Sequence, residues 1–270
     1  MQIRLGYELR YTFPRPTAMI LTLNVHHSRV SDLVYPDHML TSPSLPMRGY
    51  RDTFGNWCTR LVAPAGKLRI WTDTRINDSG ELDAVALDAE QHPVEELPED
   101  TLLFLLGSRY CETDRLSETA WKLFGNGPTG WSRVQAISDF VHRHITFGYE
   151  YASPMKSALG AYEEGRGVCR DFAHLGIAFC RALNIPARYC TGYLGDIGVP
   201  PVDAPMDFAG WFEAYLGGKW YTFDPRNNVP RIGRVLIARG RDAADVAINT
   251  TFGESSLDSF LVRTEEVVPS

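Results

Sequence analysis

The chain has 270 residues, a hydrophobic fraction of 44% and a formal net charge of −6 at pH 7. This length is enough for two modest domains, and the hydrophobic fraction is ordinary for a globular protein. Because the net charge is negative and no dense basic run occurs, we expect neither nucleic acid nor an anionic membrane as the main partner. The first residues lack the apolar core of a signal peptide, and no stretch of about 18 apolar residues is present. We therefore expect a cytoplasmic protein without a membrane span.

Strand-like patterns dominate the first 80 residues. Apolar and polar side chains alternate there, and β-branched and aromatic residues are frequent, as in strands with one buried face. The clearest examples are residues 7–11, 18–25 and 67–72. A turn over residues 52–57 separates two aromatic-rich runs. We predict a small antiparallel β domain over residues 1–80, in which no residue pattern points to chemistry.

The next segment is predicted to be a linker. Residues 81–100 are acidic and are interrupted by Pro93 and Pro98, which disfavours a regular helix or strand. A second domain is predicted over residues 101–270. Its clearest helix covers residues 131–145, where apolar side chains recur at helical spacing on one face.

Two more helices and a strand are predicted in this domain. Residues 157–164 form a short helix, whose initial serine is a suitable N-cap. A longer helix over residues 169–183 ends at Asn184, and Pro186 prevents its continuation. A strand then follows over residues 187–193.

The remaining segments are less regular. Residues 195–205 are rich in Gly and Pro, so we predict a loop that lines or covers a substrate cleft. The tail from residue 234 to residue 262 contains a strand-like run at 235–237 and an alanine-rich run at 242–248, and we find no motif in it.

Cys169 begins the longer helix, directly after a loop with Gly165 and Gly167. The N-terminus of a helix carries a partial positive charge and free N–H groups, and both favour a thiolate over a thiol. The pattern is typical of a cysteine nucleophile, but by spacing alone it is a weak signal. The alternative is a small buried residue that begins a core helix.

A hairpin follows about 40 residues later. The aromatic-rich runs 207–216 and 219–224 flank Gly217 and Gly218, which is a clear hairpin signal. The second run ends in Asp224 followed by a proline, a combination that also often begins a turn.

Together the cysteine-led helix, the hairpin and the terminal Asp-Pro resemble the transglutaminase-like superfamily of papain-type cysteine enzymes. The similarity is greatest to its bacterial branch, whose members carry an extra N-terminal β domain, and is most specific over residues 165–193 and 207–226. It implies an α+β fold with a papain/transglutaminase-like core, in which a cysteine-bearing helix packs on an antiparallel sheet, preceded by a small all-β domain. It also implies a nucleophile at Cys169 and, at Asp224, an aspartate that orients a histidine.

The histidine of this family is missing. It belongs to a His-Ala-Trp pattern on the first hairpin strand, and the matching tripeptide is Ala209-Gly210-Trp211. The position of the general base therefore holds alanine. General base catalysis is typically worth ~10²–10⁴-fold in rate, and an amide needs a proton on its leaving amine that the imidazole supplies.

Other residues replace the imidazole poorly. His174 lies five residues after Cys169 on the same helix and points about 140° away at 100° per residue. Asp207 and Glu213 share the strand face of Ala209, but a carboxylate with a pKa near ~4 is a weak base for a thiol.

Flanking arginines and the other cysteines complete the candidates. A guanidinium near Cys169 favours a thiolate, and one guanidinium is expected to pair with Asp171 or Asp224. The arginines near the site are Arg166, Arg170, Arg188 and Arg226. The cysteines are Cys58, Cys111, Cys169, Cys180 and Cys190, in odd number and without metal-ligand spacing, so we expect reduced thiols, with Cys180 in the core.

Three functions remain open from the sequence. The first is a transglutaminase-like cysteine hydrolase that cleaves peptide or amide bonds through a thioester at Cys169, with Ala209 in place of the histidine. The second is a catalytically impaired pseudoenzyme, or an inactivated variant, whose cleft binds peptide or protein without turnover. The third is an interaction protein that works through its β domain. No cofactor and no metal is implied, and the substrate and the oligomeric state stay open.

Overall fold

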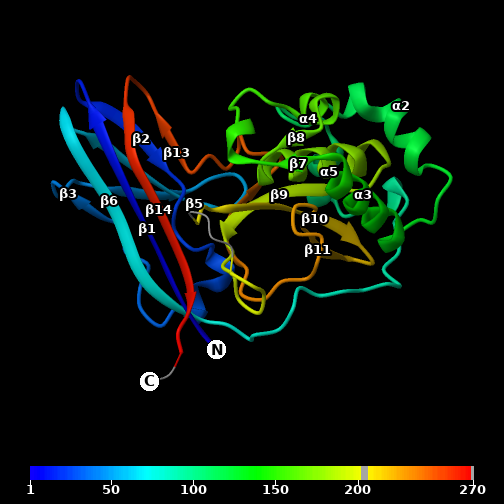
Figure 1. The fold of residues 1–270 in the computed structure, drawn as a ribbon, viewed down its shortest axis with the longest axis horizontal. Coiled ribbons are helices and arrows are strands. Elements are labelled where there is room, and N and C mark those ends of the chain that lie inside the picture. The colour runs from blue at the N-terminus through cyan, green and yellow to red at the C-terminus, as the bar shows by residue number, and fades with distance from the viewer. Residues whose placement is uncertain (202–205, 269–270) are drawn as a thin grey trace.

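The computed structural model describes residues 1–201 and 206–268. Within these residues the strands form three four-stranded sheets and one two-stranded sheet. Figure 1 shows two of the large sheets on one side of the molecule, and the third on the other side together with the main helices. The pairing within the large sheets is antiparallel. The predicted α+β fold with antiparallel sheets is confirmed.

The first two sheets contain the N-terminal strands. One has the order β14-β1-β6-β3, with β14 (Ser256–Glu266), β1 (Gln2–Phe13), β6 (Gly66–Asn77) and β3 (Leu40–Ser42). The other has the order β13-β2-β5-β4, with β13 (Asn249–Thr251), β2 (Thr17–Leu21), β5 (Trp57–Ala63) and β4 (Arg48–Arg51). Alternate side chains of β1 are fully buried, as the sequence alternation predicted.

The C-terminal strands complete these sheets. Strand β14 pairs with β1, and β13 pairs with β2, so both ends of the chain meet in the same layer (Figure 1). Neither strand was predicted from the sequence. In β14 only Val262 and Thr264 are buried, so its sequence lacks the alternation that marks a strand. The division into residues 1–80, 81–100 and 101–270 stays a prediction.

The third large sheet has the order β11-β10-β9-β12. Its strands are β11 (Lys219–Phe223), β10 (Ala209–Leu216), β9 (Ala187–Tyr193) and β12 (Val235–Gly240). The predicted hairpin is present, because Leu216 lies opposite Lys219 and Phe212 opposite Phe223. Every residue of β9 is buried, as expected for a strand with neighbours on both edges and helices on one face.

Helices cover this sheet. They are α1 (Glu99–Leu102), α2 (Thr113–Phe124), α3 (Trp131–His144), α4 (Ala158–Glu164) and α5 (Cys169–Ala182). Short 3-10 turns are η1 (His27–Asp32), η2 (Val94–Glu96), η3 (Leu103–Leu105) and η4 (Tyr149–Tyr151), and β7 (Thr146–Phe147) pairs with β8 (Arg166–Gly167). The helices α3, α4 and α5 lie where they were predicted. Helix α2 was not predicted, since it buries only a narrow stripe of side chains.

Helix α5 is the central helix of this half of the molecule. Every residue from Asp171 to Ala182 is buried. At Gly176 the helix approaches strand β10 so closely that a Cβ atom would lie 2.6 Å from the ring of Phe212. The absence of a side chain at position 176 therefore sets the distance between helix and sheet. No helix in the part of the chain that the structure describes is long and apolar enough to cross a membrane.

The Gly176 contact predicts a loss of stability on adding a methyl group. For Gly176→Ala we expect the free energy of unfolding to fall by ~1–2 kcal/mol, because overpacking against Phe212 outweighs the better helix propensity of alanine. Denaturant unfolding measures it. The control is Gly160→Ala in α4, where the nearest atom lies at 3.6 Å and stability should stay equal or rise. A neutral Gly176→Ala would contradict the tight contact.

Candidate functional site

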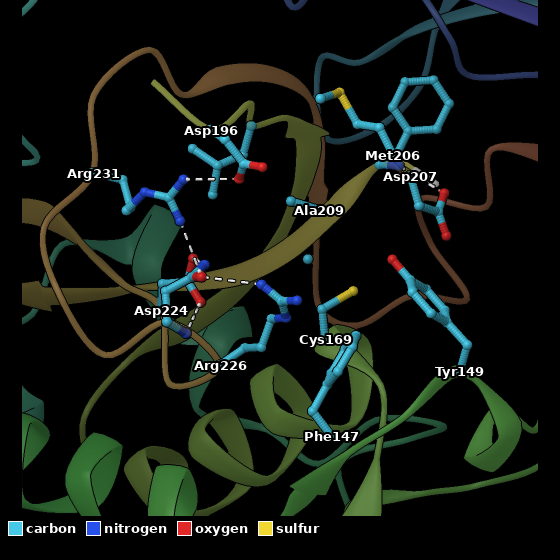
Figure 2. A pocket seen from close by; sticks show the side chains of 14 residues that line it. Phe147, Tyr149, Cys169, Asp196, Met206, Asp207, Ala209, Asp224, Arg226 and Arg231 are labelled. Atoms are coloured by element: carbon cyan, nitrogen blue, oxygen red, sulfur yellow. Dashed lines mark hydrogen bonds and ion pairs between the residues drawn. The ribbon is translucent and has the colours of Figure 1, made fainter. Parts of the chain in front are cut away.

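One pocket contains the predicted nucleophile, the predicted orienting aspartate and Ala209. It is a cavity of about 120 Å³ that opens between the start of α5, the start of β10 and the segment after β11 (Figure 2). Its lining residues are Phe147, Tyr149, Cys169, Leu194, Asp196, Met206, Asp207, Phe208, Ala209, Gly210, Asp224, Arg226, Asn227 and Arg231. Cys169, Ala209 and Asp224, which lie up to 55 positions apart in the sequence, therefore share one cavity. Of the predicted loop 195–205, Asp196 lines the pocket, and residues 202–205 lie outside the described residues.

Cys169 is the first residue of α5, and its half-buried thiol faces the pocket. Burial, reinforced by the negative charge of Asp207, raises the pKa of this thiol to about 11. The backbone N–H of Gly210 and the guanidinium of Arg226 act in the opposite direction. The expectation that the helix N-terminus favours a thiolate is thus corrected, because desolvation and a nearby carboxylate outweigh it. Burial raises the pKa of Cys111 even further, to about 12, in the core.

Asp224 directly follows β11 and is almost completely buried. Its carboxylate accepts hydrogen bonds from the backbone N–H of Asn227 at 3.2 Å and from the amide of Asn227 at 2.8 Å. The guanidinium of Arg234 donates a third bond at 3.1 Å and bridges to Asp83 at 3.0 Å. Burial opposes the charge of Arg234, but the two carboxylates raise the pKa of its guanidinium. The aspartate that orients a histidine in the family is therefore held by an amide and an arginine.

The space next to the thiol contains Arg226. Figure 2 shows its guanidinium between Asp224 and Cys169, below the small side chain of Ala209. The guanidinium stacks on the ring of Phe147, with 4.2 Å from its central carbon to the ring centroid, and donates to the side chain of Asn227 at 3.1 Å. A cation thus lies beside the thiol, as an imidazolium would, but arginine does not release its proton at ordinary pH.

A carboxylate lies on the other side of the thiol. Asp207 is exposed at the mouth of the pocket, and Figure 2 shows it with Tyr149 across from Arg226. Within the described ranges 1–201 and 206–268, the one hydrogen bond to its carboxylate comes from the backbone N–H of Phe208, at 2.6 Å. The pocket walls remove enough water to raise the pKa of this carboxyl above its ordinary value.

The structure leaves little room for a side chain at position 210. A Cβ atom at position 210 would lie 2.5 Å from the hydroxyl oxygen of Tyr189, on the neighbouring strand β9. Tyr189 is buried, and its phenol and the thiol of Cys169 are close enough that the charge of Cys169 contributes to a raised pKa of the phenol, after burial. The tyrosine hydroxyl thus occupies the room that the alanine methyl of the family pattern needs.

The other sequence candidates lie outside the pocket. His174 is buried, accepts a hydrogen bond from the N–H of Ala243 at 3.1 Å and stacks on Tyr110. Glu213 forms an ion pair with Arg188 at 2.5 Å. Of the two predicted pairings, the one with Asp171 is formed by the flanking Arg170 at 3.8 Å, whereas Asp224 pairs with Arg234, which was not among the flanking arginines.

Three of the groups around the pocket were not found from the sequence. Arg231 donates to Asn227 at 3.0 Å and to the backbone of Gly195 at 2.9 Å, and Arg234 and Asp83 hold Asp224. Asp83 comes from the predicted linker, so no spacing rule links it to the hairpin. The sequence did offer one signal for Arg231 and Arg234: two arginines spaced three residues apart follow shortly after Asp-Pro.

A cysteine-bearing helix on an antiparallel sheet, with an aspartate at a strand end in the same pocket, defines a papain-type α+β core. Residues 118–225 match the transglutaminase-like superfamily. Over its whole length the chain resembles a crystal structure described as a putative cysteine protease from Cytophaga hutchinsonii. The two share 32% identity and a TM-score of 0.84, over 100% of this chain and 92% of the other. The chain therefore belongs to the transglutaminase-like superfamily.

Curated relatives are mycobacterial and uncharacterised. A Mycobacterium leprae protein is 39% identical over 98 residues, which cover 34% of this chain and 33% of the relative. A Mycobacterium tuberculosis protein is 37% identical over 126 residues, which cover 42% of this chain and 40% of the relative. The chain thus matches a third to two fifths of the length of these relatives.

The contact between Gly210 and Tyr189 predicts coupled stability effects. We expect Gly210→Ala to lower the free energy of unfolding by ~1–3 kcal/mol, because the new methyl group overlaps the tyrosine hydroxyl. Tyr189→Phe in the same chain should restore most of the loss, and a double-mutant cycle by denaturant unfolding measures the coupling.

The control is Tyr193→Phe, on the same strand and equally buried. Its hydroxyl is not among the atoms nearest to position 210, so it should not rescue Gly210→Ala. Equal rescue by the two phenylalanine variants would show that the overlap is not the cause.

Proposed function

We propose that this chain is a catalytically impaired member of its superfamily, whose cleft binds short peptides or amides without turning them over at neutral pH. The observation that carries the proposal is Ala209 in the base position, with Arg226 in the adjacent space. A permanent cation beside the thiol attracts negative charge, but it neither accepts the thiol proton nor donates one to a leaving amine.

The thiol itself supports this proposal. With a pKa of about 11, roughly one part in 10⁴ of Cys169 is thiolate at pH 7. In addition, the Asp224 carboxylate already binds Asn227 and Arg234, so it is not free to orient a base. An amide bond that reaches Cys169 is then held in the cleft and not attacked.

A second candidate function is a cysteine hydrolase restricted to activated acyl groups, through a thioester at Cys169. It is favoured by the backbone N–H of Gly210 and the guanidinium of Arg226, both of which lower the pKa of the thiol. An ester leaving group departs without a proton, so this reaction needs thiolate but no general acid. On this proposal the rate follows the fraction of thiolate and becomes appreciable only at alkaline pH.

The raised pKa predicts the reactivity of Cys169 toward iodoacetamide. Because the thiolate is the reactive form, the alkylation rate should rise about tenfold per pH unit from pH 7 and level off only near pH 11. Asp207→Asn removes a charge that raises the pKa and should speed alkylation at pH 8 several-fold, while Arg226→Gln should slow it. Mass spectrometry measures the alkylation of Cys169 and, for comparison, of Cys180. Burial raises the pKa of the Cys180 thiol even further.

The control for charge is Asp88→Asn, an exposed site in the linker segment that is not among the lining residues, which should leave the rate unchanged. A rate that levels off below pH 8 would contradict the protonated thiol and favour the hydrolase.

The missing base predicts a gain of function. We expect the unmodified chain to bind short peptides at pH 7 without cleaving them, and Ala209→His to raise cysteine-dependent acyl transfer from a nitrophenyl ester by ~10²–10⁴-fold. Ala209→His with Arg226→Gln gives the imidazole more room. The controls are Ala209→Gln and the same variants with Cys169→Ala.

If neither histidine variant gains activity on esters, peptides or amides, the absence of the base does not explain the absence of turnover. Cleavage of peptides by the unmodified chain at pH 7 would contradict the impaired site directly.

A further inference from the structure

Arg226 is a charged group without a counter-ion in the part of the chain that the structure describes. Its side chain is held by the Phe147 ring and by a single hydrogen bond to Asn227. The nearby Asp224 is already bound by Asn227 and Arg234. The remaining N–H groups of the guanidinium are therefore available on the side of the cavity that Cys169 faces (Figure 2). A planar guanidinium with free donors is suited to a carboxylate.

Asp207 is the matching group of opposite sign. Among the described residues no arginine or lysine forms an ion pair with it, and its one hydrogen bond comes from the adjacent backbone N–H of Phe208. Both Asp207 and Arg226 are close enough to Cys169 to change the pKa of its thiol, in opposite directions. The thiol thus lies between an unpaired negative and an unpaired positive group.

We propose that the cleft recognises short zwitterionic peptides, with the free α-ammonium group at Asp207, the free carboxylate at Arg226 and the intervening amide carbonyl next to Cys169. Dipeptides are the smallest members of this class. This inference rests on the proposed peptide-binding function and specifies which peptides bind.

The size and the walls of the pocket agree with a short ligand. The cavity of about 120 Å³ is lined in part by apolar groups, including Phe147, Met206 and Phe208, which suit small aliphatic side chains. A longer peptide bound through the same carbonyl would place neutral amide groups at Asp207 and Arg226. Arg226, within the pocket, would then lose water without gaining a counter-ion, and Asp207 would gain no charged partner, so this arrangement is less favourable.

Capped ligands test the inference on the unmodified chain. Calorimetry at pH 7 compares alanyl-alanine with its N-acetyl form, its C-terminal amide and the doubly capped form. We expect each single cap to weaken binding by about tenfold or more, because each removes a charge-assisted hydrogen bond. The doubly capped peptide should bind weakest.

Variants assign each cap to one side chain. In Arg226→Gln the preference for the free carboxylate over the amide should disappear while the preference for the free amine remains. In Asp207→Asn the reverse should hold. The controls are Arg115→Gln and Asp88→Asn, both at exposed positions not among the lining residues, which should keep both preferences. Thermal unfolding checks that each variant is folded. If a variant is not folded, the capped ligands measured on the unmodified chain test the inference instead.

The outcomes separate this inference from the proposed function. If the doubly capped peptide binds as tightly as the free dipeptide, the zwitterion preference is wrong and peptide binding stands. If none of the four ligands binds, both are wrong. A loss of both preferences in a single variant would overturn the assignment of one charge to each end of the ligand.

Discussion

The close packing of helix α5 on strand β10 brings Cys169 next to Ala209 and Gly210 in the pocket. Gly176 lets the helix reach the ring of Phe212, and this contact fixes the height of the helix above the sheet. At the N-terminal end of the same helix, Cys169 meets the start of the strand at Ala209 and Gly210. The backbone of a helix and a strand therefore holds the thiol in place. The polar side chains of the pocket are not needed to position it.

The proposed function rests next on the charged groups around Cys169. In a triad, a carboxylate orients an imidazole, and the imidazole moves the proton of the nucleophile. In this chain Asp224, the carboxylate predicted for that role, forms an ion pair with Arg234, which also binds Asp83. Arg226, which adjoins the thiol, is positively charged like an imidazolium, but it does not exchange protons as an imidazole does. Among the described residues Asp224 is held by Asn227 and Arg234, whereas Asp207 and Arg226, on the two sides of Cys169, form no ion pair.

The sequence predicted the fold and the candidate residues to a useful extent, for identifiable reasons. The helices α3 and α5 and the hairpin have strong local signals, and the family pattern linked Cys169 with Asp224. The strands β13 and β14 were missed because their side chains are mostly exposed and their pairing is set by distant strands. Likewise, Asp83 and Tyr189 act on the site only through tertiary contacts, which no spacing rule contains. The thiol pKa was misjudged because a helix N-terminus is visible in sequence, whereas desolvation and the facing Asp207 are not.

The residues around Ala209 form a consistent set, and this bears on the proposed absence of a general base. Gly210 is compatible with the Tyr189 hydroxyl, whereas the alanine of the family pattern is not. Arg226 is stacked on Phe147 and occupies room that an imidazole at position 209 would share. A site that had lost only its histidine would keep a cavity shaped for it. The neighbouring groups are fitted to one another, which supports the proposal that the cleft holds a ligand by its charges without transferring a proton.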